Sequence, residues 1–441
     1  MKSKRQNHFL PSFHLISIAF IFVMIYACHK DKPISNKTDS HVSVDLQSVK
    51  LIAIQNFQKL HPELNLEVIK KTTNEEMPFI DTSFILQDKK GRNAIYFFRY
   101  LDNKGWNIIS GDNRFFPVLA YNAEGNSKLD TSLNPGLKYW VDDIFQQIDF
   151  MDNNNIFQSD AIKYEWIKYL SDSLNHLKNE PPDPGGGCTV TYNIWAYPGN
   201  NNLGFTGLKW GQTAGFNHYM APDYCEPHDY FCNKYPAGCG PVAIGMIMKY
   251  YQRPINYNAN GTNKTAIYNI MPDSIYWGYV NCANPSIDEK EIASLLRYAS
   301  GKYAQLWCFT VAVPFYYSSK SATALHPNKI KQTFADFGYS NSGNKIDYSG
   351  NFDRLIDNLK LRKPVIFSGS NCDICFWNAH IWLCEGLKEY VSETCSVYDC
   401  VFMNWGWNAL DNGWYGLSNS YAGGGTVFNN ANMKIVVDIK P

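Results

Sequence analysis

Apolar residues recur at helical spacing over residues 44–61, VDLQSVKLIAIQNFQKLH, and Pro62 follows this stretch. Because positions three and four apart share one face of a helix, the pattern predicts an amphipathic helix that ends before the proline. Four strand-like runs separated by Gly, Asn and Asp turns come next: SFILQD, NAIYFFRYL, GWNIISGD and FPVLAYN. A second helical pattern follows in NPGLKYWVDDIFQQIDFM, with Pro135 near its start. The pattern predicts a small α+β domain over residues 44–150.

The amino-acid composition of the chain changes after this domain. Residues 151–180 are polar and are predicted to be partly helical, and residues 179–187, NEPPDPGGG, combine three prolines with three glycines. Neither a helix nor a central strand tolerates that composition, so we interpret residues 151–189 as a linker. Ten of the twelve cysteines follow from residue 225 onward. We therefore expect a second, cysteine-rich domain over residues 190–441.

The N-terminus has the pattern of an export signal. Three basic residues lie within the first five positions, and an apolar stretch of thirteen residues follows from Leu15 to Ala27. That length is too short for a stable membrane anchor and is typical of a signal peptide. The stretch ends at Cys28, where bacterial lipoprotein signals place the cysteine that receives the lipid. We predict a lipoprotein signal over residues 1–27, lipidation of Cys28 and a polar tether over residues 28–43, with ordinary signal cleavage nearby as the alternative.

Composition narrows the choice of partners. Forty basic residues balance forty acidic ones, so there is no electrostatic case for nucleic acid as a partner. Hydrophobic residues make up 45% of the chain and aromatic residues 15%, enough for a large core. Export favours disulfides. Setting aside Cys28 and one candidate nucleophile leaves ten cysteines, which allows up to five disulfides of undetermined pairing.

One cysteine lies at the predicted start of a buried helix. The stretch YPAGCGPVAIGMIMKYYQRP over residues 235–254 places Cys239 between two glycines, ahead of Pro241 and a nearly all-apolar run. Proline suits the first turn of a helix, and we expect the helix to end at Arg253, before Pro254. The unpaired N–H groups and the dipole of a helix N-terminus stabilise a thiolate. Cys239 is therefore a candidate nucleophile, and a disulfide or a core position is the alternative.

A thiolate nucleophile needs an imidazole and an oxyanion donor. His380 begins an apolar strand-like stretch, FWNAHIWLCEGL, although a core histidine would fit the same setting. Further on, Asn404 and Trp405 end another apolar strand, where the amide could fix the imidazole tautomer and the indole could exclude water. Gln212 precedes Cys239 by 27 residues and could donate to an oxyanion. The order Gln, Cys, His, Asn is the order of papain-like cysteine proteases.

Together these stretches resemble the streptopain family, the secreted papain-fold cysteine proteases of bacteria. WGQ before FN, GC before Ile-Met and Tyr-Tyr, Ala-His before an apolar strand, and NWGW before NGWYG occur in the family's order. The stretch GWNIISGDNRFFPVLAYNAEG, with the helix after it, is similar to the family's propeptide-like inhibitory domain. The resemblance implies an α+β fold, with a papain-like catalytic domain over residues 190–441 behind an inhibitory domain over residues 44–150.

Carried over residue by residue, the resemblance implies Cys239 as nucleophile, His380 as general base and acid, and Gln212 as oxyanion donor. It implies that Asn404 and Trp405 orient and shield His380. The expected activity is that of an exported cysteine endopeptidase, made as a zymogen, working through a thiolate–imidazolium pair and an acyl-enzyme. Its expected partners are protein or peptide substrates and its own N-terminal domain, with a membrane contacted only through the lipid. We expect no cofactor and no metal.

Three alternatives stay open at this stage. Cys372, Cys375, His380 and Cys384 have a spacing one residue short of a zinc knuckle, and a zinc site there would remove His380 from catalysis. The papain-like domain could also be inactive and serve as a binding or inhibitory module on the cell surface. Lastly, the same residues could transfer the acyl group to an amine rather than to water.

Overall fold

The computed structural model describes residues 43–64, 79–129, 134–174, 189–199, 207–313, 316–369, 379–392, 397–417 and 433–441. The predicted signal peptide, Cys28, the tether as far as residue 42 and the Pro- and Gly-rich segment lie outside these ranges. Within them, no helix combines the length and the apolar character needed to cross a membrane.

The predicted N-terminal elements are confirmed. Helix α1 begins after Asp45, whose side chain caps it by accepting a hydrogen bond of 2.9 Å from the Ser48 N–H. The four predicted strands form an antiparallel sheet, and the second predicted helix is the long α3. A further helix, α4, packs on α1. The bounds are α1 (Leu46–Leu60), β1 (Ile80–Gln87), β2 (Asn93–Tyr100), β3 (Trp106–Ser110), β4 (Val118–Asn122), α3 (Pro135–Asn153) and α4 (Asp160–Leu174).

The C-terminal part mixes helices and strands, as the α+β prediction requires. Its helices are α5 (Cys239–Tyr251), α6 (Ile287–Ser294), α7 (Asn328–Asp336) and α8 (Phe352–Lys360), and a π-helical turn, Leu295–Ser300, continues α6. Its strands are β5 (Thr191–Ala196), β6 (Asn256–Ala259), β7 (Thr262–Thr265), β8 (Gln305–Val313), β9 (Tyr316–Ala324), β10 (Asn341–Asp347), β11 (Val365–Gly369), β12 (His380–Val391), β13 (Val397–Asn404), β14 (Gly413–Gly416) and β15 (Met433–Lys440).

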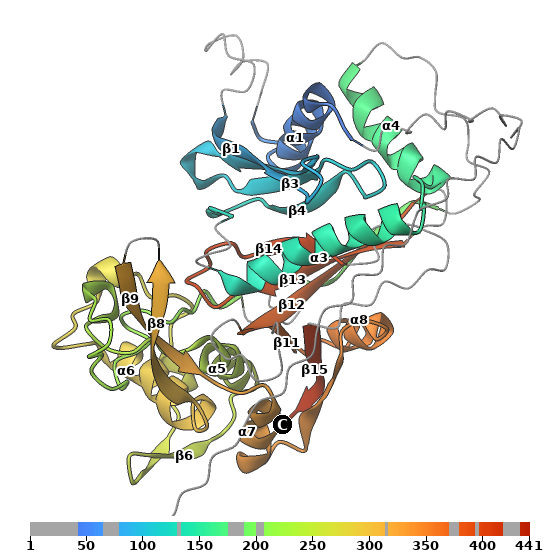
Figure 1. Ribbon diagram of the computed structural model, residues 1–441. Coiled ribbons are helices and arrows are strands. Elements are labelled where there is room, and N and C mark those ends of the chain that lie inside the picture. Colours follow the sequence, from blue (N-terminus) through green and yellow to red (C-terminus); the bar gives the residue numbers. More distant parts are fainter. Residues whose placement is uncertain are drawn as a thin grey trace, which may run out of the picture. The chain divides into compact units, whose positions relative to one another are not determined.

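One sheet runs through both parts of the chain (Figure 1). Its strand order is β1-β2-β3-β4-β14-β13-β12-β11-β15-β10, and β5 also pairs with β12. The two parts meet where β4 pairs with β14, with Trp414 opposite Tyr121 and Tyr415 opposite Ala120. The N-terminal sheet therefore adds its last strand directly to the C-terminal sheet.

Side chains of the central strands point alternately to the two faces of the sheet, and a different helix packs on each face. Val365 and Phe367 of β11 point into the same cluster as Trp382 of β12, and α3 contributes to that cluster. Ile366 and Leu383 point to the opposite face, into the cluster that contains α5. Because successive side chains in a strand point to opposite faces, near-continuous apolar strands indicate a sheet covered on both sides. Here α3 covers one face and α5 the other.

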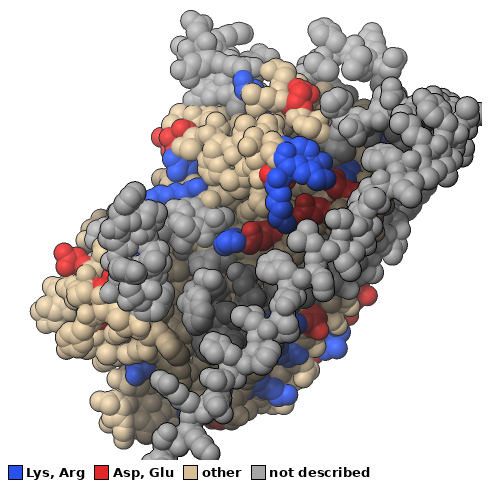
Figure 2. Space-filling model, viewed as in Figure 1, with Lys and Arg blue, Asp and Glu red and all other residues tan. Residues whose placement is uncertain are grey.

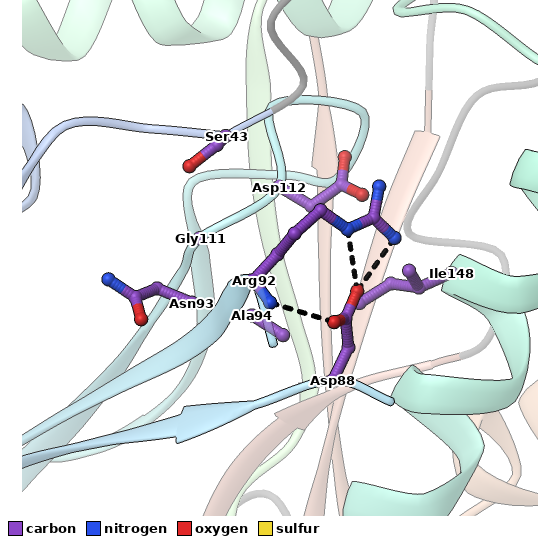
Figure 3. Close-up of a pocket in the computed structure, with 8 residues that line it drawn as sticks. All are labelled: Ser43, Asp88, Arg92, Asn93, Ala94, Gly111, Asp112 and Ile148. Atoms are coloured by element: carbon purple, nitrogen blue, oxygen red, sulfur yellow. Dashed lines mark hydrogen bonds and ion pairs between the residues drawn. The ribbon is translucent and has the colours of Figure 1, made fainter. Parts of the chain in front are cut away.

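Charged side chains join the C-terminal half of α3 to the N-terminal sheet. Figure 3 shows Arg92 donating to Asp88, with Asp112 beside it and Ile148 of α3 facing the group. Asp152 of α3 accepts from Arg92 at 2.6 Å and from two further cations, Lys90 and Arg114. Burial raises the pKa of Asp152, but the three cations outweigh it and hold the pKa at about 2.

Oppositely charged side chains also meet on the surface. On the face in Figure 2, basic and acidic side chains lie in small mixed groups. Lys89 donates to Asp149 at 2.8 Å, and Lys138 pairs with Asp142 one turn along α3. This mixture agrees with the balanced net charge and gives that face no broad region of a single sign.

Two disulfides secure the long loops around α5. Cys225 bonds to Cys308 of β8, and Cys232 bonds to Cys282. The bonds join residues that are 83 and 50 positions apart, and closing such loops limits the freedom of the unfolded chain. Disulfides were among the predictions from the sequence, and these two confirm that the chain uses them.

Candidate active site

Cys239 is the first residue of α5, and the residue before it, Gly238, is the N-cap. Gly238 has φ of 95°, and a Cβ there would lie 2.6 Å from the carbonyl oxygen of Thr323. Only glycine meets both conditions without strain. Residues 240–248 are buried, so the prediction of a central apolar helix is confirmed. The helix ends at Tyr251, two residues before the predicted end.

The Cys239 thiol is half-buried and forms no disulfide. Burial raises the pKa of this thiol. The nearby backbone N–H groups of Ile381 and Gly240 act in the opposite direction, because they favour the thiolate. Ile381 directly follows His380, so the strand that carries the candidate base also contacts the candidate nucleophile.

His380 is the first residue of β12 and is almost completely buried, with 2% of its surface exposed. Its Nε2 lies 3.1 Å from the carbonyl oxygen of Trp405. Because a carbonyl can only accept, Nε2 carries the hydrogen and Nδ1 is left as the basic nitrogen. Burial lowers the pKa of His380 to about 4, against a smaller opposite effect of this hydrogen bond. The imidazole is therefore neutral at pH 7.

Two tryptophan rings lie parallel to the imidazole. The Trp382 ring centroid is 5.9 Å from that of His380 at an angle of 17°, and the Trp407 centroid is 6.4 Å away at 9°. Sequence reasoning missed both as neighbours of His380. The spacing of two residues between His380 and Trp382 could have indicated the first, because such positions share one face of a strand.

The predicted role of Asn404 differs from what the structure shows. Its amide nitrogen donates to the Leu208 carbonyl at 2.6 Å and to Glu385 at 2.8 Å, and its amide oxygen accepts from the Gly406 N–H. The amide thus fixes the turn after β13, and it is the main-chain carbonyl of Trp405 that holds the imidazole. An amide and a carbonyl oxygen are equivalent acceptors for an N–H, which is why the carbonyl can replace the expected amide.

The folded chain brings the main chain of Gln212 close to that of Cys239. Its carbonyl oxygen accepts a hydrogen bond of 2.9 Å from the N–H of Ala237, two residues before the cysteine. The Gln212 side chain is buried, and its Nε2 has no hydrogen-bond partner among the described residues. A buried donor without an acceptor costs free energy, which makes such an atom a candidate for binding a charge that develops during a reaction.

The N-terminus of α3 covers His380. A Cβ added at Gly136 would lie 2.5 Å from Cδ2 of His380 and 2.6 Å from Cε3 of Trp405. One turn later, the Tyr139 ring lies against Gly369, the residue paired with His380 across β11 and β12. The first turn of α3 therefore lies directly on the imidazole and the indole.

Asp411 is a second connection between α3 and the site, and sequence reasoning missed it. This carboxylate accepts hydrogen bonds from the Ser127 hydroxyl at 2.6 Å, the Lys128 N–H at 3.2 Å and the Asn134 amide at 3.2 Å. Those donors lie 277–284 residues earlier in the chain, so no local pattern indicates the contact.

The zinc alternative is not tested, because Cys372 and Cys375 lie outside the described residues. Of its other two ligands, Cys384 is buried with a free thiol, and His380 uses Nε2 for the Trp405 carbonyl. In the part of the chain that the structure describes, no group of three or more His, Cys, Asp or Glu residues could hold a metal ion.

Two family models match the chain. The model of the peptidase C10 family matches residues 210–415, which contain Cys239, His380 and their neighbours. The part of the chain over residues 210–415 belongs to the peptidase C10 family. A model of the Spi protease inhibitor matches residues 43–148, the part that includes α1, the first four strands and most of α3. This C10 peptidase is therefore a cysteine peptidase made as a zymogen, with its inhibitor domain ahead of its peptidase domain.

Two solved structures from Prevotella intermedia are similar to this C10 peptidase. A fragment of prointerpain A, a cysteine-to-alanine mutant, is 16% identical, and the match covers 82% of this chain and 100% of that one with a TM-score of 0.43. Active wild-type interpain A cysteine protease is 17% identical, and the match covers 58% and 98% with a TM-score of 0.33. No curated protein matches the chain.

Proposed function

We propose that Cys239 is the nucleophile of this peptidase, His380 its general base and acid, and Gln212 its oxyanion donor. The observation that supports the assignment is the close approach of Ile381, which follows His380, to Gly240, which follows Cys239: a Cβ added at Gly240 would lie 3.2 Å from Cδ1 of Ile381. It brings the start of β12, which carries His380, to the N-terminus of α5. The third role is supported by Gln212 Nε2, which has no partner in the part of the chain that the structure describes, and by the bond of the Gln212 carbonyl to Ala237, two residues before Cys239.

The proposed reaction follows from these positions. His380 Nδ1 takes the thiol proton, and the Cys239 sulfur attacks the peptide carbonyl to form a tetrahedral oxyanion. The Gln212 amide donates to that oxyanion, since its N–H has no competing acceptor among the described residues. The imidazolium then protonates the leaving amine, and the C–N bond breaks to give an acyl-enzyme. Water, deprotonated by His380, attacks the thioester and releases the acid.

Latency is explained by what α3 does to the imidazole. With Gly136 lying on His380, the ring is buried and its pKa is lowered. A buried imidazole gains little by accepting a proton from the thiol, so the pair stays neutral. We propose that cleavage within residues 175–189 and departure of α3 expose His380 and permit the ion pair to form.

The assignment is tested by comparing the wild-type chain with Cys239→Ala. Both proteins, without residues 1–27, are incubated under mild reduction and followed by SDS gels and N-terminal sequencing. We expect the wild type to cut itself near residues 170–190 and the variant to stay whole. If both stay whole, and a thiol-directed protease inhibitor leaves Cys239 unlabelled even after the first domain is removed, the domain is a binding module.

We also propose that the protein is exported and carries a lipid on Cys28. The basic residues, the short apolar stretch and the position of Cys28 support export, and two disulfides in the peptidase domain favour an oxidising compartment. Cleavage after residue 174 would then release the peptidase from the membrane. Labelling with radioactive palmitate should mark the wild type and leave Cys28→Ala unlabelled, and equal labelling would contradict the proposal.

A further inference from the structure

We propose that Asp411 is a specificity-determining residue of the mature peptidase, whose carboxylate binds hydrogen-bond donors on the leaving-group side of the scissile bond. This inference rests on the proposed function, because it places the substrate relative to His380. In the zymogen the same carboxylate is occupied by Ser127, Lys128 and Asn134 of the inhibitor domain.

The present occupants of Asp411 are all hydrogen-bond donors from the inhibitor domain. Ser127 donates its hydroxyl at 2.6 Å to Oδ1, Lys128 its backbone N–H at 3.2 Å, and Asn134 its amide at 3.2 Å to Oδ2. The side chain is 1% exposed in this state. A carboxylate is buried at low cost only when several donors compensate it, and this segment supplies them.

The peptidase domain holds Asp411 in place without these donors. The Trp405 indole N–H donates to the carbonyl oxygen of Asp411 at 2.9 Å, and the Tyr415 hydroxyl donates to it at 2.6 Å. Both partners belong to the peptidase domain, so the position of Asp411 survives the loss of the inhibitor domain. The loss removes the donors to the carboxylate and the Asn126 carbonyl, which accepts from the Asp411 N–H at 3.3 Å, and the carboxylate is left able to accept new donors.

The position of Asp411 relative to His380 defines which part of a substrate can reach it. Asn134, which donates to Asp411, also caps α3 by accepting from the Leu137 N–H at 3.2 Å. Between these residues, Gly136 lies on His380 and Trp405. The inhibitor domain therefore follows a continuous path from the imidazole, over the indole, to the carboxylate.

A substrate can follow the same path on one side of the scissile bond. Because His380 protonates the leaving amine, that amine lies against the imidazole. The residues after it then run over Trp405 toward Asp411, where an anionic acceptor favours N–H and O–H donors and repels carboxylates. We expect a preference for Lys, Arg, Ser or Asn, and a rejection of Asp and Glu, within the first four residues after the cut.

The test measures kcat/KM for internally quenched peptides with the processed peptidase. The peptides are identical except that each of the first four residues after the cut is changed in turn to Lys, Ser, Ala or Asp. For the wild type we expect Lys or Ser to exceed Asp by roughly tenfold at one of these positions, the range of a hydrogen bond to a charged group. Asp411→Gly and Asp411→Asn should reduce that ratio to below about twofold. The φ of 60° at Asp411 suits both replacements, since glycine and asparagine tolerate this conformation.

Two controls separate a change in substrate specificity from a general loss of activity. Asp336→Asn alters a carboxylate of α7 whose partners Lys302, Tyr303 and Gln332 all lie in the peptidase domain, and it should keep the wild-type preference. A substrate whose leaving group is a coumarin amide has no residue to place at Asp411, so the Asp411 variants should lose less activity on it, per titrated thiol, than on the Lys and Ser peptides.

Specific results would overturn the inference. A preference that persists in Asp411→Gly, a wild type without preference at all four positions, or an equal loss on the coumarin amide each contradicts it. If the wild type cleaves neither the peptides nor the coumarin amide, the proposed function itself is contradicted. Cleavage of the coumarin amide without any donor preference contradicts the inference alone.

Discussion

At the scale of single residues, burial sets the charge state of the catalytic pair. It raises the pKa of Cys239 and lowers that of His380, so both changes favour the neutral thiol and the neutral imidazole. A thiolate–imidazolium pair, which the sequence led us to expect, belongs to the state in which the inhibitor domain has left. We propose that the zymogen is inactive because its nucleophile, Cys239, is protonated.

Alkylation of Cys239 should report this difference. In the zymogen we expect slow reaction with iodoacetamide at pH 7 and a steep rise only above pH 9, because the reacting species is the thiolate. The processed enzyme should react about a hundredfold faster at pH 7. The Cys239→Ala protein gives the background from the other free thiols, which include the buried Cys384 and the half-buried Cys400. Similar rates for the two forms at pH 7 would show that burial does not control the thiol.

The Gln212 amide allows a second residue-level prediction. Gln212→Glu keeps the shape of the side chain but removes the N–H donor, and Gln212→Ala removes the side chain. Both should lower kcat of the processed enzyme by about 10²–10³, with KM changed less than about threefold, because the donor acts on the oxyanion. Steady-state kinetics normalised to titrated thiol check this. A fall confined to KM would place Gln212 in substrate binding instead.

At the scale of elements, α3 has two roles, as a helix of the core and as the element that inhibits the active site. Its apolar face packs on the sheet, while its first turn contacts the catalytic imidazole. Alanine is favoured over glycine inside helices by about 1 kcal/mol, so Gly136 is a local cost. The close approach of His380 and Trp405 explains that cost, because any Cβ would overlap both rings.

Gly136→Ala should therefore weaken latency. The added methyl group forces α3 away from His380 and costs roughly 1–3 kcal/mol of docking, although it favours the helix itself. We expect faster self-processing, measured as a shorter lag before activity appears. Lys138→Ala, in the same turn of α3 but exposed, is the matched control and should keep the wild-type lag. A longer lag for Gly136→Ala would mean that helix propensity outweighs the contact.

At the scale of the whole molecule, the two domains form a single sheet with a helix on each face of its centre. Inhibition is thus built into the fold through strand pairing of β4 with β14, the packing of α3 and the bonds to Asp411. The cations around Asp152 secure the far end of α3, and with a pKa of about 2 this carboxylate stays charged in mild acid.

Acid should destabilise the zymogen through His380. Its pKa is about 4 when folded and about 6.5 when unfolded, so the unfolded chain binds the extra proton between these values. Stability that is complete above pH 6.5 is lost as the pH falls toward 4, by at most about 3 kcal/mol. Urea unfolding of the Cys239→Ala zymogen at pH 7 and pH 4.5 measures this. The same protein with His380→Gln should lose less over the interval, and an equal loss would assign the effect to other groups.

The sequence predicted the elements well and the contacts between distant residues poorly. The helix that begins at Cys239 and the strand that begins at His380 follow from local apolar patterns, which the structure confirms. The carbonyl of Trp405 could not be predicted as the partner of His380, because every residue has a carbonyl and none is marked in the sequence. The role of Asp411 depends on donors near residue 130, and only the folded sheet brings them together.

The pairing of β4 with β14 has a consequence for the life of the enzyme after activation. When the inhibitor domain leaves, β14 changes from an interior strand to an edge, and main-chain groups of Trp414 and Tyr415 lose their partners. Bare edges recruit strands from other molecules, and keeping them short is one natural defence. With four residues, Gly413–Gly416, this edge is short, yet a nascent peptidase without its inhibitor domain would expose it while still folding. The inhibitor domain therefore protects the peptidase from self-association as well as its surroundings from proteolysis.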